Sequence, residues 1–136
     1  MKRTERFLFP IIVFTDSDEM IALDYPFLMG DKRLLDSAFK NVKIIDSNGI
    51  YYKVEKVEQD SGIILKYSIK LMGLTVKVKP IFSQEPEQIS FEELKSQIKS
   101  HVAKHKRFGS VLDDGRGLSR MIDETNNFKD LIKMFI

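Results

Sequence analysis

Two short stretches near the C-terminal end contain the residues that could do chemistry. In VLDDGRGLSR, residues 111–120, Asp113 and Asp114 could bind a divalent cation through carboxylate oxygens, and the neighbouring arginines could hold a phosphate. His101 and His105 are four residues apart, a spacing that places both side chains on one helical face and that zinc sites use. These four residues are the candidate metal ligands, so a small metal-dependent hydrolase is one hypothesis for the chain.

Local folding explains both stretches without a ligand. Adjacent side chains such as Asp113 and Asp114 do not point the same way on regular structure, and aspartate and glycine are common turn residues. The histidines are surrounded by lysines, which repel a cation, and His105 falls on an apolar helical stripe. We therefore interpret 111–120 as a linker and the histidines as packing residues, and we predict no catalytic residue, metal or cofactor.

A basic helix flank is the second candidate. Lys95, Lys99 and Lys106 line one side of a predicted helix and could contact phosphate groups. The net charge of the chain is only +2, and few aromatic residues are placed where they could stack on bases. A nucleic-acid-binding module is thus an alternative that the composition does not favour.

The opening apolar run is the least ordinary feature of the sequence. FLFPIIVF, residues 7–14, is apolar on both alternating faces, and Pro10 predicts an edge strand or a bulge. One thin sheet and two helices cannot bury all of these side chains unless something covers the second face. The C-terminal helices are the favoured cover. The alternative is an interface with another protein, and its candidate binding residues are Phe7, Phe9, Ile12 and Phe14.

The elements that position these residues follow from hydrophobic periodicity and turn signals. Residues 7–14 and 19–24 predict a hairpin, and Asp31 could cap a short helix within 26–39. Asn48-Gly49, between apolar runs at 42–46 and 50–57, is the strongest short hairpin signal. Asp60-Ser61-Gly62 predicts a further turn, with alternating strands over 63–71 and 74–79 before Pro80 ends the ladder.

The last third of the chain predicts helices. Ser90 and Glu93 form a capping box, and Phe91, Leu94, Ile98 and Val102 make an apolar stripe. Residues 118–124 and 128–136 predict one or two further short helices. The fold class is therefore α+β, an antiparallel meander of about five strands with C-terminal helices packed on one face. We expect a single domain, 1–136, with the sheet mainly within 7–82 and the helices mainly within 90–136.

Length and composition limit the class of protein further. A chain of 136 residues can bury a real core without a metal or a disulfide. The absence of cysteine removes disulfides and thiolate chemistry, which suits the cytoplasm. The apolar run after Lys2 and Arg3 is too short to span a bilayer and lacks a cleavage pattern, so we expect neither a secretion signal nor a membrane partner.

The order of elements resembles that of a known group of proteins. FLFPIIVF, IIDSNGIYYKVE, GLTVKVKP and SFEELKSQIKSHV together resemble small bacterial single-domain α+β proteins, some of which are immunity partners of secreted toxins. The resemblance implies no functional residue. It favours a non-enzymatic, cytoplasmic domain that binds another protein, in one form as an immunity-type inhibitor. A homodimer is compatible with every hypothesis, because oligomeric state alone does not decide function.

Overall fold

The Asn48-Gly49 turn forms the predicted hairpin at the centre of the fold. In the computed structural model, which describes residues 7–104 and 116–136, strands β4 (Val42–Ile45) and β5 (Ile50–Ile63) pair antiparallel with Ile45 opposite Tyr51. Gly49 has a φ of +77°, a conformation that glycine adopts without steric cost. The predicted N-terminal hairpin is also confirmed, since β1 (Ile11–Phe14) pairs antiparallel with β2 (Met20–Leu23).

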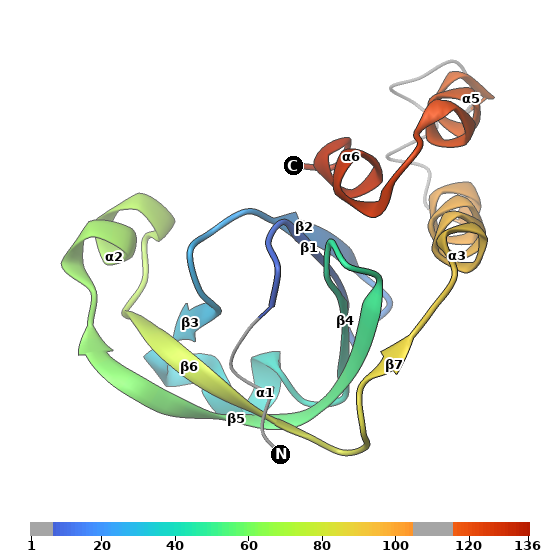
Figure 1. The fold of residues 1–136 in the computed structure, drawn as a ribbon. Coiled ribbons are helices and arrows are strands. Elements are labelled where there is room, and N and C mark those ends of the chain that lie inside the picture. Colours follow the sequence, from blue (N-terminus) through green and yellow to red (C-terminus); the bar gives the residue numbers. More distant parts are fainter. Residues whose placement is uncertain (1–6, 105–115) are drawn as a thin grey trace.

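The sheet is antiparallel and strongly curled, and it has more strands than predicted (Figure 1). Its seven strands include β3 (Met29–Asp31), β6 (Thr75–Phe82) and the short β7 (Glu87–Gln88). The order is β2-β1-β4-β5-β6-β3, with β7 beside β5, so the chain is not a simple meander. Register shifts in the long β5, between Val54 and Lys56 and between Gln59 and Ile63, bend that strand and promote the curl. The α+β class is confirmed.

The first strand is not at an edge. It lies between β2 and β4, and Pro10 precedes it, so the missing N–H of the proline interrupts no ladder bond. Ile12 and Ile11 point to opposite faces of the sheet because side chains alternate along a strand. Both are fully buried. The edge prediction was wrong because Pro10 was counted as part of the strand.

Residues 60–82 differ most from the sequence expectation. The turn predicted at Asp60-Ser61-Gly62 is absent, because β5 continues to Ile63. The predicted strand 63–71 is instead helix α2 (Leu65–Leu71). Pro80 does not end the ladder: it lies inside β6 opposite Val57, where β3 no longer flanks that strand. A proline is tolerated there because β6 has a ladder partner on one side only.

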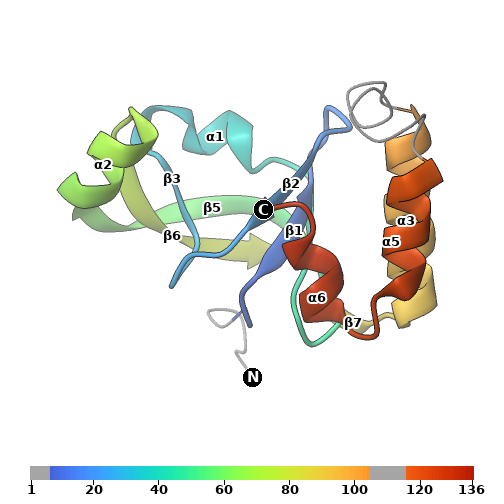
Figure 2. The same ribbon diagram turned by 90° about the horizontal axis from the view of Figure 1, so that it is seen from above.

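Two apolar clusters lie on the two faces of β1. Helices α3 (Phe91–Lys104), α5 (Arg116–Glu124) and α6 (Phe128–Lys133) stand on one side of the sheet (Figure 2). Their buried side chains join those of the sheet in the first cluster, which contains Ile12, Met20, Ile45, Ile89, Leu94, Ile98, Val102, Ile122, Leu131 and Ile132. The second cluster lies inside the curl and contains Ile11, Val13, Leu28, Val42, Ile44, Tyr52, Val54, Val57, Val76 and Val78.

Helix ends follow the predicted capping chemistry. The Ser90 hydroxyl accepts a hydrogen bond from the Glu93 N–H at 3.0 Å, so α3 begins where the capping box places it. The Asp31 carboxylate accepts one from the Arg33 N–H and caps the 3₁₀ turn η1 (Lys32–Leu34), which continues into α1 (Leu35–Ala38). The short helix predicted within 26–39 is therefore present, although β3 before it was not predicted.

Candidate functional site

The protein itself covers both faces of the first strand. Ile12 has no exposed surface and belongs to the cluster beneath the C-terminal helices. Phe14 is half-buried against the same cluster. Phe7 and Phe9 are half-buried beside the other cluster, and the Phe7 ring packs edge-on against the Tyr52 ring at 4.7 Å between centroids. These four candidate binding residues thus present little free apolar surface.

The lysine flank of α3 is engaged with α5. The Lys95 side chain is only 11% exposed, and its Nζ donates to the Asp123 carbonyl oxygen at 3.4 Å. Lys99 donates to the Asp123 carboxylate, and this hydrogen bond lowers the pKa of that carboxyl. The two lysines join α3 to α5, so they do not form the open basic flank that the nucleic-acid alternative would use. Lys106 lies outside the described residues.

The structure describes only one of the four candidate metal ligands, His101. His101 is 4% exposed, its Nδ1 lies 3.8 Å from a carboxylate oxygen of Asp18, and its ring packs against Phe14. His105, Asp113 and Asp114 lie outside the described residues, as do residues 111–115 as a whole. Residues 116–120, which we interpreted as part of a linker, belong to α5 instead. Within residues 7–104 and 116–136, no group of three or more His, Asp or Glu side chains could hold a metal ion.

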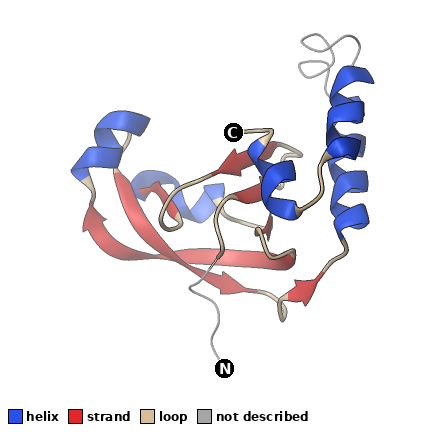
Figure 3. Ribbon diagram, turned by 45° about the horizontal axis from the view of Figure 1, so that its top comes forward, coloured by secondary structure: helices blue, strands red, loops and turns tan. Residues whose placement is uncertain are grey.

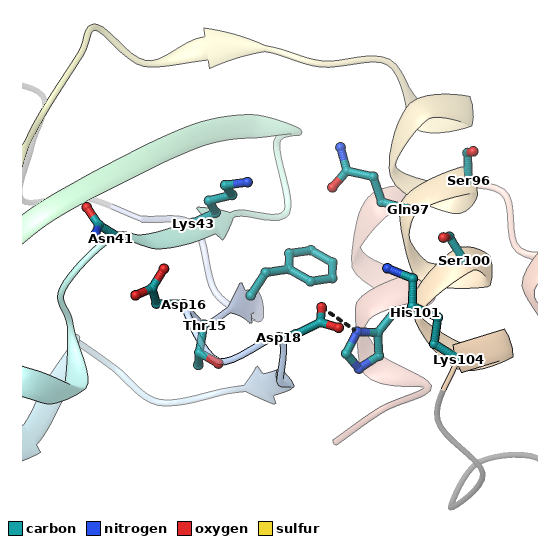
Figure 4. Close-up of a pocket in the computed structure, with 11 residues that line it drawn as sticks. Thr15, Asp16, Asp18, Asn41, Lys43, Ser96, Gln97, Ser100, His101 and Lys104 are labelled. Atoms are coloured by element: carbon teal, nitrogen blue, oxygen red, sulfur yellow. Dashed lines mark ion pairs between the residues drawn. The ribbon is translucent and has the colours of Figure 1, made fainter.

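A polar cleft of about 590 Å³ lies between α3 and the sheet (Figure 4). Its walls come from the β1–β2 turn, the start of β4 and one side of α3. The lining residues are Phe14, Thr15, Asp16, Asp18, Asn41, Lys43, Ser96, Gln97, Ser100, His101 and Lys104. Sequence reasoning missed the cleft because its residues come from three separate segments, each of which has an ordinary turn, strand or helix pattern.

The chemistry of the cleft is that of hydrogen bonding and ion pairing. Asp16 and Asp18 offset the charges of Lys43 and Lys104, so the lining has no strong preference for one sign of charge. The Thr15 hydroxyl is already used within the turn, where it accepts from the Glu19 N–H at 3.0 Å. His101 Nδ1 faces Asp18 (Figure 4). This arrangement suits the packing of α3 on the hairpin better than nucleophilic catalysis.

Helix α2 lies at the other end of the curled sheet from the C-terminal helices (Figures 1 and 3). Its buried side is polar and aromatic. The Ser68 hydroxyl donates to the Ile64 carbonyl oxygen and accepts from the Thr75 N–H, both at 2.9 Å. The Tyr67 ring packs edge-on against Tyr25 and Phe27, with centroids 5.8 and 6.1 Å away. Ser68 thus joins α2 to β6, and Tyr67 joins it to the segment before β3.

The aliphatic side chains of α2 face solvent. Leu65 is 70% exposed, Ile69 is 71% exposed and Met72, the left-handed cap of the helix, is 90% exposed. A spacing of four residues places Leu65 and Ile69 on one helical face, and Met72 follows at the C-terminal end of the helix. We call these three residues the α2 ridge. They are the three most exposed large apolar side chains in the described part of the chain.

The sequence contains a signal for the ridge that alternation obscured. Residues 63–71 alternate as a strand would, but Leu65, Ile69 and Met72 also fit a helical face. Both the strand pattern and the helix pattern predict an apolar surface on this segment. In the helix that the structure has, Leu65, Ile69 and Met72 remain exposed. Lys66 and Lys70 adjoin the ridge. The Lys66 Nζ lies 5.3 Å from the Tyr67 ring centroid, and the Lys70 Nζ lies 5.9 Å from the Tyr25 ring centroid.

The fold and these surfaces define an α+β protein with one helix face left apolar and exposed. Comparisons of the chain with protein-family models, with curated proteins and with solved structures found no match. Across the described ranges, no helix combines the length and the apolar character needed to cross a bilayer.

Proposed function

We propose that this protein functions by binding another protein through the α2 ridge, without catalysing a reaction. One observation carries the proposal: Leu65 and Ile69 lie on one face of α2, Met72 follows at the C-terminal cap of the helix, and all three are apolar and at least 70% exposed. Apolar side chains at this spacing are the usual anchors of a helix that docks into an apolar groove. The binding surface is therefore α2 rather than the first strand.

Burial of the ridge would contribute appreciably to binding. Full burial of one leucine, isoleucine or methionine side chain is favourable by about 1.5 to 3 kcal/mol. The three ridge side chains are mostly exposed in the free protein, so their burial by a partner would contribute several kcal/mol to the free energy of binding. Part of this gain is offset by lost translational and side-chain freedom. The remainder is enough for a specific contact if further residues around α2 also take part.

An immunity-type inhibitor is one form of this function. Such a protein blocks a toxin by stoichiometric binding, and the order of elements in this chain resembles that of small bacterial proteins that include such inhibitors. The proposal places binding in the cytoplasm, which the lack of cysteine favours. It requires no cofactor.

The test compares capture by three forms of the protein from the source cells. The ridge variant carries Leu65→Ser and Ile69→Ser; the control carries Met121→Ser and Ile136→Ser, two exposed apolar residues of the C-terminal region. We expect one stoichiometric protein to be retained by the wild type and the control and lost by the ridge variant. Equal retention by all three forms, or recovery of nucleic acid alone, would refute the proposal.

The ridge variant must also fold. Because both side chains are about 70% exposed, we expect the free energy of unfolding to fall by no more than about 1 kcal/mol, as judged by urea denaturation. A partner that binds only the folded state should raise the Tm of the wild type and leave the Tm of the ridge variant unchanged. These two measurements separate loss of binding from loss of structure.

A further inference from the structure

We infer that the α2 ridge binds an acidic, partly apolar protein segment, in which carboxylates meet Lys66 and Lys70 while apolar side chains cover the ridge. This inference rests on the proposed function and names the chemistry of the partner. It follows from the charge around α2, from the side of the ridge on which the two lysines lie, and from the occupants that this arrangement disfavours.

The charged residues nearest the ridge along the chain are lysines. Residues 61–79 contain four lysines, at 66, 70, 77 and 79, and no aspartate or glutamate. Two acidic side chains that lie beside this segment are each paired with a cation: Asp31 with Arg33 at 2.7 Å, and Asp60 with Lys77 at 4.0 Å. Lys77 and Lys79 thus face acidic residues of the chain itself, since Glu58 lies opposite Lys79 in the β5–β6 register. Lys66 and Lys70 take part in none of the ion pairs of the described residues, so these two are the cations that carboxylates of a partner could meet.

The two lysines nearest the ridge lie on one side of it. On a helix with about 3.6 residues per turn, Lys66 and Lys70 lie on the same side of the row formed by Leu65 and Ile69. Each ammonium group sits over an aromatic ring, Lys66 over Tyr67 and Lys70 over Tyr25. A contact surface with apolar anchors on one side and lysines on the other is complementary to a segment that has one apolar and one acidic side.

A second copy of this chain is not the occupant that these charges favour. In a two-fold dimer the same patch meets itself, so Lys66 and Lys70 of one copy would approach the same lysines of the other. Like charges that are brought together at an interface cost binding energy. A homodimer would need a different face.

A lipid surface is also less suited to this ridge. Proteins at a bilayer interface commonly use exposed aromatic side chains as anchors. Here the aromatic residues Tyr25, Phe27 and Tyr67 are half-buried and packed against one another, and α2 is only seven residues long. Interfacial helices that lie in the headgroup region are generally longer.

The probe that tests the inference is a library of random 16-residue peptides displayed on phage and selected on the intact protein. Peptides that also bind the Leu65→Ser, Ile69→Ser variant are removed, so only ridge-dependent sequences remain. We expect these to combine apolar residues at helical spacing with aspartate or glutamate. Lys66→Gln with Lys70→Gln should weaken their binding by about fivefold or more, as measured by fluorescence polarisation.

The matched control is Lys129→Gln with Lys133→Gln, an exposed lysine pair at the same spacing on α6. It should leave peptide affinity unchanged. The inference is overturned if the ridge-dependent peptides are not enriched in aspartate or glutamate, or if they bind the wild type and the Lys66/Lys70 variant equally well. Either result leaves the proposed function intact. A selection that yields no ridge-dependent peptide overturns both. Ridge-dependent co-sedimentation with phosphatidylserine vesicles overturns the inference by assigning the surface to lipid.

Discussion

Asp46 should be the polar residue whose loss most affects the central hairpin. Its side chain is 1% exposed, and its carboxylate accepts hydrogen bonds from the N–H groups of Leu8, Asn48 and Ile50 and from the Tyr52 hydroxyl, at 2.9 to 3.3 Å. One residue thus holds the N-terminal segment, the turn and β5 together. Asp46→Ala would leave all four donors without this acceptor.

The expected magnitude follows from the burial of those donors. A buried donor that loses its partner costs about 1 to 3 kcal/mol, whereas a donor that water can reach costs less. The bond from Tyr52 is buried and the three backbone bonds are partly buried. Removing the desolvation cost of the carboxylate offsets part of the loss. We expect Asp46→Ala to lower the free energy of unfolding by about 2 to 4 kcal/mol, and Asp46→Asn, which keeps one acceptor oxygen, by about half as much.

Urea denaturation monitored by circular dichroism would measure the loss, and calorimetry should show a fall in Tm of about 8 to 15 °C. Tyr52→Phe supplies a double-mutant cycle, because it removes one donor and should cost less in the Asp46→Ala background than alone. A loss below about 1 kcal/mol, or strictly additive effects of the two substitutions, would refute the role assigned to these bonds.

Two further predictions concern a turn and an acid-dependent contact. Gly49→Ala should destabilise the protein by about 2 to 4 kcal/mol in urea denaturation, because φ at residue 49 is +77° and the new Cβ would overlap the Phe128 ring. The control is Gly62→Ala, whose Cβ would meet nothing within 4 Å and which should change stability by less than about 0.5 kcal/mol. Equal effects of the two substitutions would contradict this account. Asp31 has a pKa well below its ordinary 3.8 because the arginine two residues later donates hydrogen bonds to it. Because this pKa is lower in the folded than in the unfolded state, the contact stabilises the fold above about pH 4, and that stability is lost as the pH falls further. In a plot of the free energy of unfolding against pH, Asp31→Asn should therefore flatten the fall between about pH 4 and pH 2 and leave the alkaline side unchanged. An unaltered fall at acid pH would argue against the contact.

Local signals predicted those parts of the fold in which one short segment determines its own structure. Asn48-Gly49 requires a turn with positive φ, and Ser90 with Glu93 satisfies the first turn of α3. Both features depend on residues within a few positions of each other. The α+β class could be predicted from such segments. The number and order of the strands and the helix at residues 65–71 could not, because they depend on contacts between segments.

The main error, at residues 63–71, arose where a short apolar run fits two periods. Ile63, Leu65, Tyr67, Ile69 and Leu71 alternate as a strand does, and no proline or glycine within the run favours either structure. The helix is selected by distant contacts: Ser68 bonds to Thr75, and Tyr67 packs against aromatic residues that lie before β3. Those contacts cannot be derived from the run itself.

The candidate site could not be located from the sequence for a related reason. An apolar residue identifies a surface only after its burial is known, and the most apolar stretch, residues 7–14, is covered by the chain's own helices and sheet. Lys95 and Lys99 looked like a free cationic flank because their partner, Asp123, lies more than twenty residues further along the chain. The sequence contains the right residue types, but the packing of distant segments decides which remain available to a partner.

The contacts that hold α2 in place come mainly from residues outside the ridge. α2 is held by Ser68, by Tyr67 and by the left-handed backbone at Met72, whose N–H donates to the Ser68 carbonyl oxygen. None of these contacts uses the Leu65 or Ile69 side chain, so serine at both positions would leave them intact and would reduce exposed apolar area. Large exposed apolar patches favour association, which is a liability unless a partner covers them. The proposed function accounts for the ridge by contact with a partner, and the lysines beside it are the basis for proposing an acidic one.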